Sequence, residues 1–140
     1  MATLLPTNLY GESGARFIGT GGGGTFLVPV LINNAITLNF YLDSGASDVS
    51  IPSDVFGTLI RAGTITKSDI LGADTYRLAD GSSKKSITFR IRSLKVGPVT
   101  LENVKGSVAE DAGPLLLGMS FLSRFKEWTV DNQRHVLVLR

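Results

Sequence analysis

The hydrophobic and polar positions of this chain alternate over short segments, which is the pattern of half-buried β-strands. Segment 86–92 alternates throughout, with Ile87, Phe89 and Ile91 on one face and polar residues on the other. The denser apolar runs are bounded by turn residues and cover 26–32, 36–42, 127–130 and 135–139. Many short strands with turns about every eight to twelve residues predict an all-β fold. We expect a small, closed, β-barrel-like domain with a single lobe and two short helices.

Turn residues between these strands predict three hairpins. Their turns are expected at Asn33-Asn34, at 80–83 and at 131–134, and further short strands are expected near 75–79, 94–96 and 99–104. One helix is expected over 54–61, with Ser53 as its N-cap and Gly63 near its end. The second helix is expected over 119–125, and 64–73 is expected to be irregular with one turn near 66–70.

The chain has 140 residues, which predicts one domain. Residues 1–24 are rich in Gly, Ser and Thr and end in four glycines, so we expect a flexible leader there and the folded domain over 25–140. The spacing of Gly19, Gly21 and Gly24 formally matches a dinucleotide fingerprint. That fingerprint should open a helix, whereas here it precedes a predicted strand.

Composition excludes several classes of function. The net charge of +2 is too small to be the electrostatic footprint of a nucleic-acid-binding protein. There is no cysteine and only one histidine, His135, so disulfides, thiolate chemistry and the usual His/Cys zinc sites are excluded. No run approaches the ~20 apolar residues of a membrane span, and the first twenty residues lack the pattern of a signal peptide. We expect a cytoplasmic protein, unless a targeting segment precedes this sequence.

One motif carries candidate chemistry. Asp43-Ser44-Gly45-Ala46 follows the apolar segment 40–42 and precedes another, 49–51, so a carboxylate is placed in a tight turn where a strand ends. Asp, Ser and Gly are also ordinary turn residues, so the tripeptide alone is not diagnostic.

A second motif lies downstream. Leu116-Leu117-Gly118 ends an apolar run and precedes the expected helix at 119–125. With both motifs in this order and a hairpin between them, the chain resembles the retropepsin-like aspartic proteases from about residue 25 to residue 139, and is most similar to their bacterial single-domain branch. Met119 and Ser120 stand where retroviral members carry Arg followed by Asp or Asn, and Ser47 stands where they often carry Asp, so no retroviral substrate preference is carried over.

The resemblance implies an acid-protease fold and an aspartic endopeptidase that cleaves protein or peptide substrates without a metal or an organic cofactor. Because one chain carries one such motif, it implies a symmetric homodimer with Asp43 as the catalytic residue of each copy. A water between the two carboxylates would be activated by one while the other donates to the scissile carbonyl, and the pair would share one proton. The C-terminal hairpin with Trp128 and residues before 25 are the expected dimer contacts.

The resemblance also implies roles for the neighbours of Asp43. The active-site loop is completed by Ser44, Gly45 and Ala46, with Gly45 letting its N–H approach the carboxylate. The hairpin at 76–92 is the expected flap, which would close over an extended peptide. The expected substrate-binding residues are Ser47, Asp48, Ala79, Asp80, Gly81 and Ser82, and the expected loop supports are Leu116, Leu117 and Gly118.

Two other functions remain open. A non-catalytic dimeric peptide-binding module would keep the groove, but the intact Asp-Ser-Gly-Ala sequence argues against a decayed site. A small β-barrel that binds nucleic acid would use the local basic cluster, which consists of Lys84, Lys85, Arg90, Arg92 and Lys95. Few aromatic residues interleave with this cluster, so base stacking lacks its platform.

Overall fold

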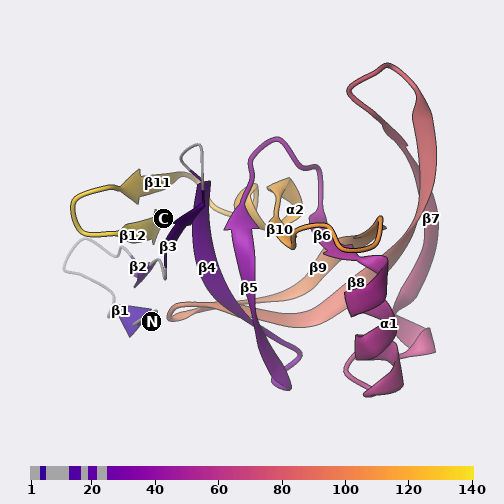
Figure 1. Cartoon of the computed structure of the whole chain (residues 1–140). Helices are drawn as coiled ribbons and strands as arrows, with labels where there is room; N and C mark the ends of the chain where they lie inside the picture. The colour runs from indigo at the N-terminus through magenta and orange to yellow at the C-terminus, as the bar shows by residue number, and fades with distance from the viewer. Residues whose placement is uncertain (1–3, 6–12, 17–18, 22–24) are drawn as a thin grey trace.

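The computed structural model describes residues 4–5, 13–16, 19–21 and 25–140, and its strands form two sheets (Figure 1). The larger sheet has the order β3 (Gly19–Gly21), β4 (Thr25–Ile32), β5 (Ile36–Leu42), β10 (Leu116–Leu117), β6 (Val49–Pro52), β9 (Val99–Ala109), β8 (Ser83–Val96) and β7 (Ile70–Arg77). The smaller sheet has the order β1 (Leu4–Leu5), β2 (Ser13–Arg16), β12 (Val136–Leu139) and β11 (Trp128–Asp131). The described helices are α1 (Ser53–Arg61), the 3₁₀ turn η1 (Lys67–Asp69) and α2 (Met119–Leu122).

An additional pairing makes the larger sheet ring-like. The end of β4 pairs antiparallel with β8, in the register Leu31 with Lys95 and Ile32 with Leu94. The inward-facing side chains of the ring form the core, which contains the fully buried Phe40, Phe89 and Phe121. The expected all-β class with two short α-helices is confirmed.

The expected hairpins form, although some strands are longer than expected. Asn33 and Asn34 turn the chain between β4 and β5 with φ of 49° and 55°, a conformation that asparagine tolerates better than most residues. β8 runs without a break from the turn of the β7–β8 hairpin to Val96, where a separate short strand was expected near 94–96. β8 stays one strand because it is paired along its length with three neighbouring strands, β7, β9 and β4.

Both helices differ from expectation at their ends. Ser53 is not the N-cap of α1: Pro52 precedes the helix in an extended conformation, no side chain caps it, and the Ser53 hydroxyl instead contacts Asp111. α2 ends at Leu122, short of the expected residue 125. Beyond it, the N–H groups of Arg124 and Phe125 bond three residues back, at 3.1 and 3.2 Å, which is the tighter 3₁₀ pattern.

The C-terminal hairpin β11–β12 forms as expected, and all four residues of β12 are buried. The expected leader, residues 1–24, lies partly outside the described residues; within it, β2 pairs with β12 and β3 pairs with β4. In the part of the chain that the structure describes, no helix has the length and apolar character needed to cross a membrane.

Candidate active site

Asp43 follows the last residue of β5, at the start of the loop that leads to β6. The short strand β10 lies between β5 and β6, parallel to the first and antiparallel to the second. The carbonyl of Leu117, in β10, accepts the Asp43 N–H at 3.2 Å, and the carbonyl of Leu115 accepts the Tyr41 N–H at 2.8 Å. A segment far downstream in the sequence therefore fixes the backbone that carries the candidate catalytic carboxylate.

The loop also holds the Asp43 side chain. The Gly45 N–H donates to Asp43 Oδ1 at 2.9 Å, and the Ala46 N–H donates to the Asp43 carbonyl at 3.2 Å. A Cβ at position 45 would lie 3.1 Å from Asp43 Oδ1, so glycine allows this close approach. Ser44 and Gly45 are exposed, whereas Asp43 is half-buried.

Gly118 is the point where the second motif meets the loop. A Cβ there would lie 2.2 Å from the Asp48 carbonyl oxygen and 2.7 Å from that of Ala46. These are backbone atoms, so only glycine fits. At the start of α2, the Met119 N–H donates to the Ala46 carbonyl at 2.8 Å, and the Ser120 N–H donates to the Ser47 carbonyl at 2.9 Å. The predicted supports Leu116, Leu117 and Gly118 thus lie against the loop, with Leu117 fully buried.

Ser120 adds a support that the sequence did not suggest. Its hydroxyl accepts the Val49 N–H at 2.8 Å and donates to the Lys105 carbonyl at 2.6 Å, so it joins the start of β6 to β9. The only signal in the sequence was a small polar residue in the first turn of a helix after a glycine.

A second carboxylate of the loop, Asp48, is buried, with 7% of its surface exposed. Its Oδ2 accepts a short hydrogen bond from the Tyr76 hydroxyl, and Lys105 Nζ lies 4.0 Å from the same oxygen. Lys105 also pairs with Asp74. Burial and then the bond to Asp48 raise the pKa of Tyr76 to about 12, so the phenol stays a neutral donor. Sequence reasoning missed Tyr76, because nothing local marks a strand tyrosine as the partner of this loop.

A pocket of about 390 Å³ lies between the loop, the arms of the β7–β8 hairpin and β9. Of the predicted substrate-binding residues, Ser47 and Asp48 line it; the hairpin contributes Tyr76 and Leu78, among others. Asp43 lies outside the pocket lining.

The predicted flap tip, Ala79 to Ser82, is exposed and does not line the pocket. The tip is a tight turn in which the Leu78 N–H donates to the Ser82 carbonyl at 2.7 Å and the Gly81 N–H donates to the Leu78 carbonyl at 3.0 Å. Hydrogen bonds from the hydroxyl and N–H of Ser82 hold the pKa of Asp80 below its usual range.

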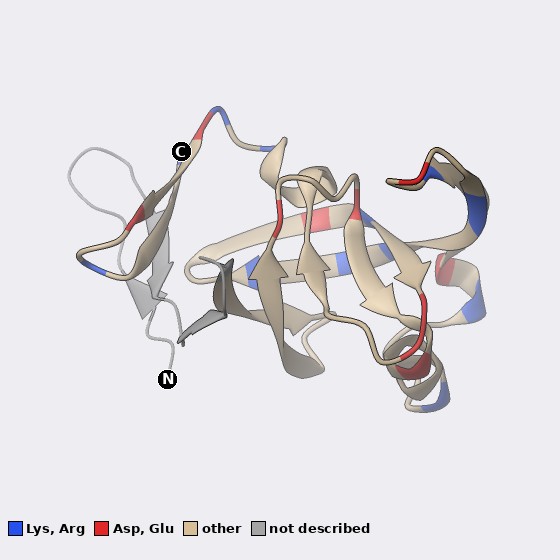
Figure 2. Ribbon diagram, turned by 45° about the horizontal axis from the view of Figure 1, so that its top comes forward, with Lys and Arg blue, Asp and Glu red and all other residues tan. Residues whose placement is uncertain are grey.

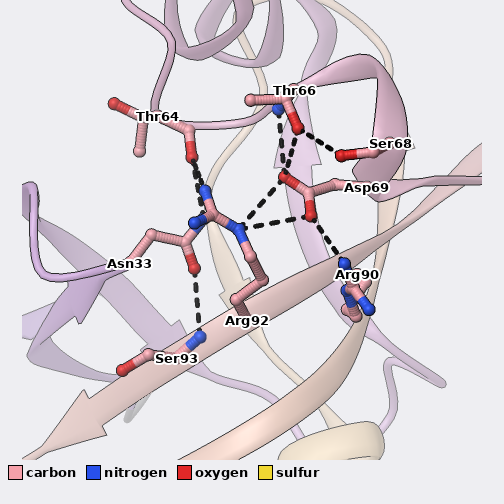
Figure 3. A network of polar contacts seen from close by, with 8 residues as sticks. All are labelled: Asn33, Thr64, Thr66, Ser68, Asp69, Arg90, Arg92 and Ser93. Atoms are coloured by element: carbon pink, nitrogen blue, oxygen red, sulfur yellow. Dashed lines mark hydrogen bonds and ion pairs between the residues drawn. The ribbon is translucent and has the colours of Figure 1, made fainter.

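The base of the hairpin is fixed by a polar network around Asp69 (Figure 3). Asp69 is fully buried; Arg90 Nη2 and Arg92 Nε lie 3.3 Å from its carboxylate, and the Thr66 N–H donates to it at 3.0 Å. Burial is the largest single influence and raises the pKa of Asp69, but Thr66, Arg90 and Arg92 together outweigh it and hold the pKa low. Arg92 also donates to the Thr64 carbonyl at 2.8 Å.

The basic cluster seen in the sequence is largely paired with acids. Lys84 Nζ lies 3.0 Å from Glu110, and Arg90 and Arg92 both contact Asp69. Figure 2 accordingly shows Lys, Arg, Asp and Glu interspersed along the ribbon rather than gathered into one basic face. Among the described residues, no group of three or more His, Asp or Glu side chains is placed to hold a metal ion.

The ring-like sheet, the inserted strand β10 and the Asp-Ser-Gly loop beneath a long hairpin define a retropepsin-like fold. A crystal structure of a retropepsin-like aspartic protease from Rickettsia conorii matches with a TM-score of 0.64 and 26% identity, over 92% of this chain and 90% of that one. The retroviral protease-like domain of Ddi1 from Leishmania major shares the fold, with a TM-score of 0.53 and 18% identity over 82% of this chain and 87% of that one.

The sequence comparisons agree with the fold. The family model described as "gag-polyprotein putative aspartyl protease" matches residues 28–124, and the chain belongs to this retropepsin-like family. An uncharacterized protein of Rickettsia prowazekii is 30% identical over 151 residues, which cover 98% of this chain. The chain matches 57% of the length of that relative.

Proposed function

We propose that the protein is an aspartic endopeptidase, active as a symmetric homodimer in which two copies of Asp43 face one another. The observation that carries the proposal is the loop itself. Asp43 is held by backbone bonds from both sides and its carboxylate accepts the Gly45 N–H at 2.9 Å, within a chain of the retropepsin-like family.

The chemistry needs two carboxylates and one water. One Asp43 carboxylate takes a proton from the water, which attacks the scissile carbonyl, while the other, protonated, donates to the carbonyl oxygen. The amide bond then breaks as the leaving nitrogen is protonated. Two carboxyls about 3 Å apart cannot both ionise cheaply, so they hold one proton between them.

The second carboxylate must come from another copy. The other acid of the loop, Asp48, is buried and bound to Tyr76, so it is not available as the second member of the pair. Ser44 and Gly45 are exposed beside Asp43, where a two-fold axis would bring the same residues of a partner. Such an interface is self-complementary.

Substrate would lie extended between this loop and the β7–β8 hairpin, bonded through its main chain as an added strand. Ser47 and Asp48 would contact it from the loop side, and Ala79, Asp80, Gly81 and Ser82 would contact it from the flap tip once the flap closes. No nucleic acid, metal or organic cofactor takes part in the proposal, and a cytoplasmic location stays a prediction.

The test is cleavage of an unbiased peptide mixture by the wild type and by Asp43→Asn, measured by mass spectrometry across roughly pH 3.5 to 7.5, a window around carboxylate titration. Glu102→Gln, which changes an exposed carboxylate on β9, is the matched control. We expect cleavage by the wild type and the control, none by Asp43→Asn, and a fall in specific activity when dilution dissociates the dimer. If the folded, dimeric wild type cuts nothing, the peptide-binding module replaces the enzyme.

A further inference from the structure

We infer that the pocket beside the active-site loop selects a cationic side chain of the bound peptide, lysine or arginine, and that Asp48 is the residue that recognises its charge. The inference rests on the proposed endopeptidase function and adds a substrate class to it. Asp48 would act as a specificity-determining residue, separate from Asp43, which lies outside the pocket.

The first support is the unused hydrogen-bonding capacity of Asp48. Its carboxylate lines the pocket and is 93% buried, since 7% of the residue is exposed. The contacts from Tyr76 and Lys105 both fall on Oδ2. A carboxylate can accept about four hydrogen bonds, so Asp48 can accept one from a donor that enters the pocket in addition to its contacts with Tyr76 and Lys105.

The second support is the charge balance of the pocket. Asp48 lines the pocket, whereas Lys105 and Asp74 lie outside its lining. Lys105 is shared between Asp48 and Asp74, and its contact with Asp74 is the closer one, so these three groups sum to one negative charge next to the pocket. Tyr76 adds none, because its pKa of about 12 keeps it protonated. Lys84 and Glu110, which also line the pocket, pair with each other at 3.0 Å and cancel. In a partly buried site this residual charge is less screened than on the surface.

The third support is the shape and lining of the pocket. Leu78, Val108, Ala109 and Leu116 give it apolar walls, and its volume of about 390 Å³ is in the range of pockets that enclose small ligands. Apolar walls with a carboxylate among them suit the methylene stem and charged head of lysine or arginine. An acidic side chain would be repelled by Asp48, and a purely apolar one would displace water from the carboxylate without donating a hydrogen bond to it.

The test uses peptides that differ at one position only. Cut sites from the mass-spectrometry experiment supply a parent sequence, and each position near the cut is made with lysine, norleucine or glutamate. Norleucine keeps the apolar stem of lysine and lacks the ammonium group. At one position we expect kcat/KM for lysine to exceed that for norleucine by about tenfold or more, the effect of one charge-assisted hydrogen bond, with glutamate lowest.

Variants assign this preference to Asp48. Asp48→Asn keeps an acceptor for Tyr76 and removes the charge, so we expect the lysine-to-norleucine ratio to fall toward one. Glu102→Gln should keep the ratio, because Glu102 is exposed and lies outside the pocket lining. Should Asp48→Asn fail to fold, Tyr76→Phe serves instead: it removes a competing donor, and the ratio should be kept or raised.

The same ratio is measured as peptide affinity on Asp43→Asn. Where nothing is cut, the parent sequence is a peptide that this variant retains from the same mixture, so the inference is still tested. A wild type that cleaves without cation preference, or an Asp48→Asn variant that keeps the preference, overturns this inference and leaves the endopeptidase standing. A protein that cuts no peptide but binds the lysine peptide about tenfold more tightly than the norleucine peptide overturns the enzyme and leaves the cation pocket standing.

Discussion

Asp69→Asn tests the polar network that holds the base of the β7–β8 hairpin (Figure 3). The substitution keeps the size of the side chain and removes its charge. One amide oxygen can still accept the Thr66 N–H, which donates to Asp69 at 3.0 Å, but the amide nitrogen is a donor and would face the guanidinium of Arg90 or Arg92. The variant therefore loses the charge of both ion pairs and weakens the hydrogen bonds from Thr66 and Arg92 that fall on the same oxygen.

The loss of stability expected for Asp69→Asn follows from how deeply each partner of the two ion pairs is buried. Asp69 is fully buried, but the side chains of Arg90 and Arg92 are 41% and 47% exposed, so water screens both pairs. Two screened pairs at about 0.5–1 kcal/mol each, and about 1 kcal/mol for the weakened charge-assisted bond, give about 2–3 kcal/mol. This is below the ~3–5 kcal/mol for a fully buried pair that loses one partner. For a domain of this size, the melting temperature should fall by roughly 6–12 °C.

The direction in which the pKa of Asp69 is shifted decides how its contribution to folding stability changes with pH. The pKa of Asp69 is lowered in the folded protein, so its stabilisation is fully present above the unfolded pKa, near ~3.9. It is lost as the pH falls through the lower folded pKa. The difference between wild type and Asp69→Asn should be constant from about pH 8 to pH 5 and shrink below about pH 4.

The assay is urea unfolding followed by far-UV circular dichroism, at one protein concentration because self-association would shift apparent stability. Glu102→Gln is the control, since Glu102 is exposed on β9, and we expect no measurable change from it. If Asp69→Asn is as stable as the wild type at pH 7, or if the gap persists undiminished at pH 3, the network does not contribute as argued.

Three further substitutions test the supports of the loop. Gly118→Ala places a Cβ 2.2 Å from the Asp48 carbonyl oxygen, so we expect the free energy of unfolding in urea to fall by more than ~3 kcal/mol. Gly57→Ala in α1 is the control. Its Cβ meets only the Arg61 side chain, at 3.3 Å, so it should be neutral or stabilising by up to ~1 kcal/mol. Ser120→Ala leaves the Val49 N–H without its partner and should cost about 1–3 kcal/mol by the same assay, with thermal melting as the check. Tyr76→Phe should lower the free energy of unfolding by about 1–2 kcal/mol at pH 7, because it removes the hydrogen bond to Asp48. The pKa of Tyr76 is raised to about 12 in the folded protein, so the difference in stability between wild type and variant should hold up to pH ~10 and shrink as the pH rises further.

The sequence predicted those features that depend on local pattern. Alternating and dense apolar segments gave most of the strands and the expected hairpins, and the order of the two motifs gave the fold family. Ser53 was wrongly taken as an N-cap, because a serine before a helix is a strong local signal. Pro52, already in an extended conformation with φ of −59°, takes that position instead.

The contacts that complete the candidate site were not predictable in this way. Tyr76 reaches Asp48 across 28 residues, and the Ser120 hydroxyl reaches the Val49 N–H across 71. Alternation assigns a residue to a face of a strand, but not to a partner on another element. The Asp69 network needed the curvature of β8, which brings two of its arginines over η1, and no single segment of sequence encodes that curvature.

The two-residue strand β10 also sets the order in which the site can be made. Its register joins Leu116 to Tyr41 and Leu117 to Leu42, so β5, which ends just before Asp43, lacks one neighbour until residues 116 and 117 are present. During synthesis, domains form from the N-terminus onward, and Asp43 is made long before Gly118. A nascent or truncated chain that ends before Leu115 therefore carries the Asp-Ser-Gly sequence without its geometry. The candidate catalytic loop is assembled only once the segment from Leu115 to Ser120 has been made.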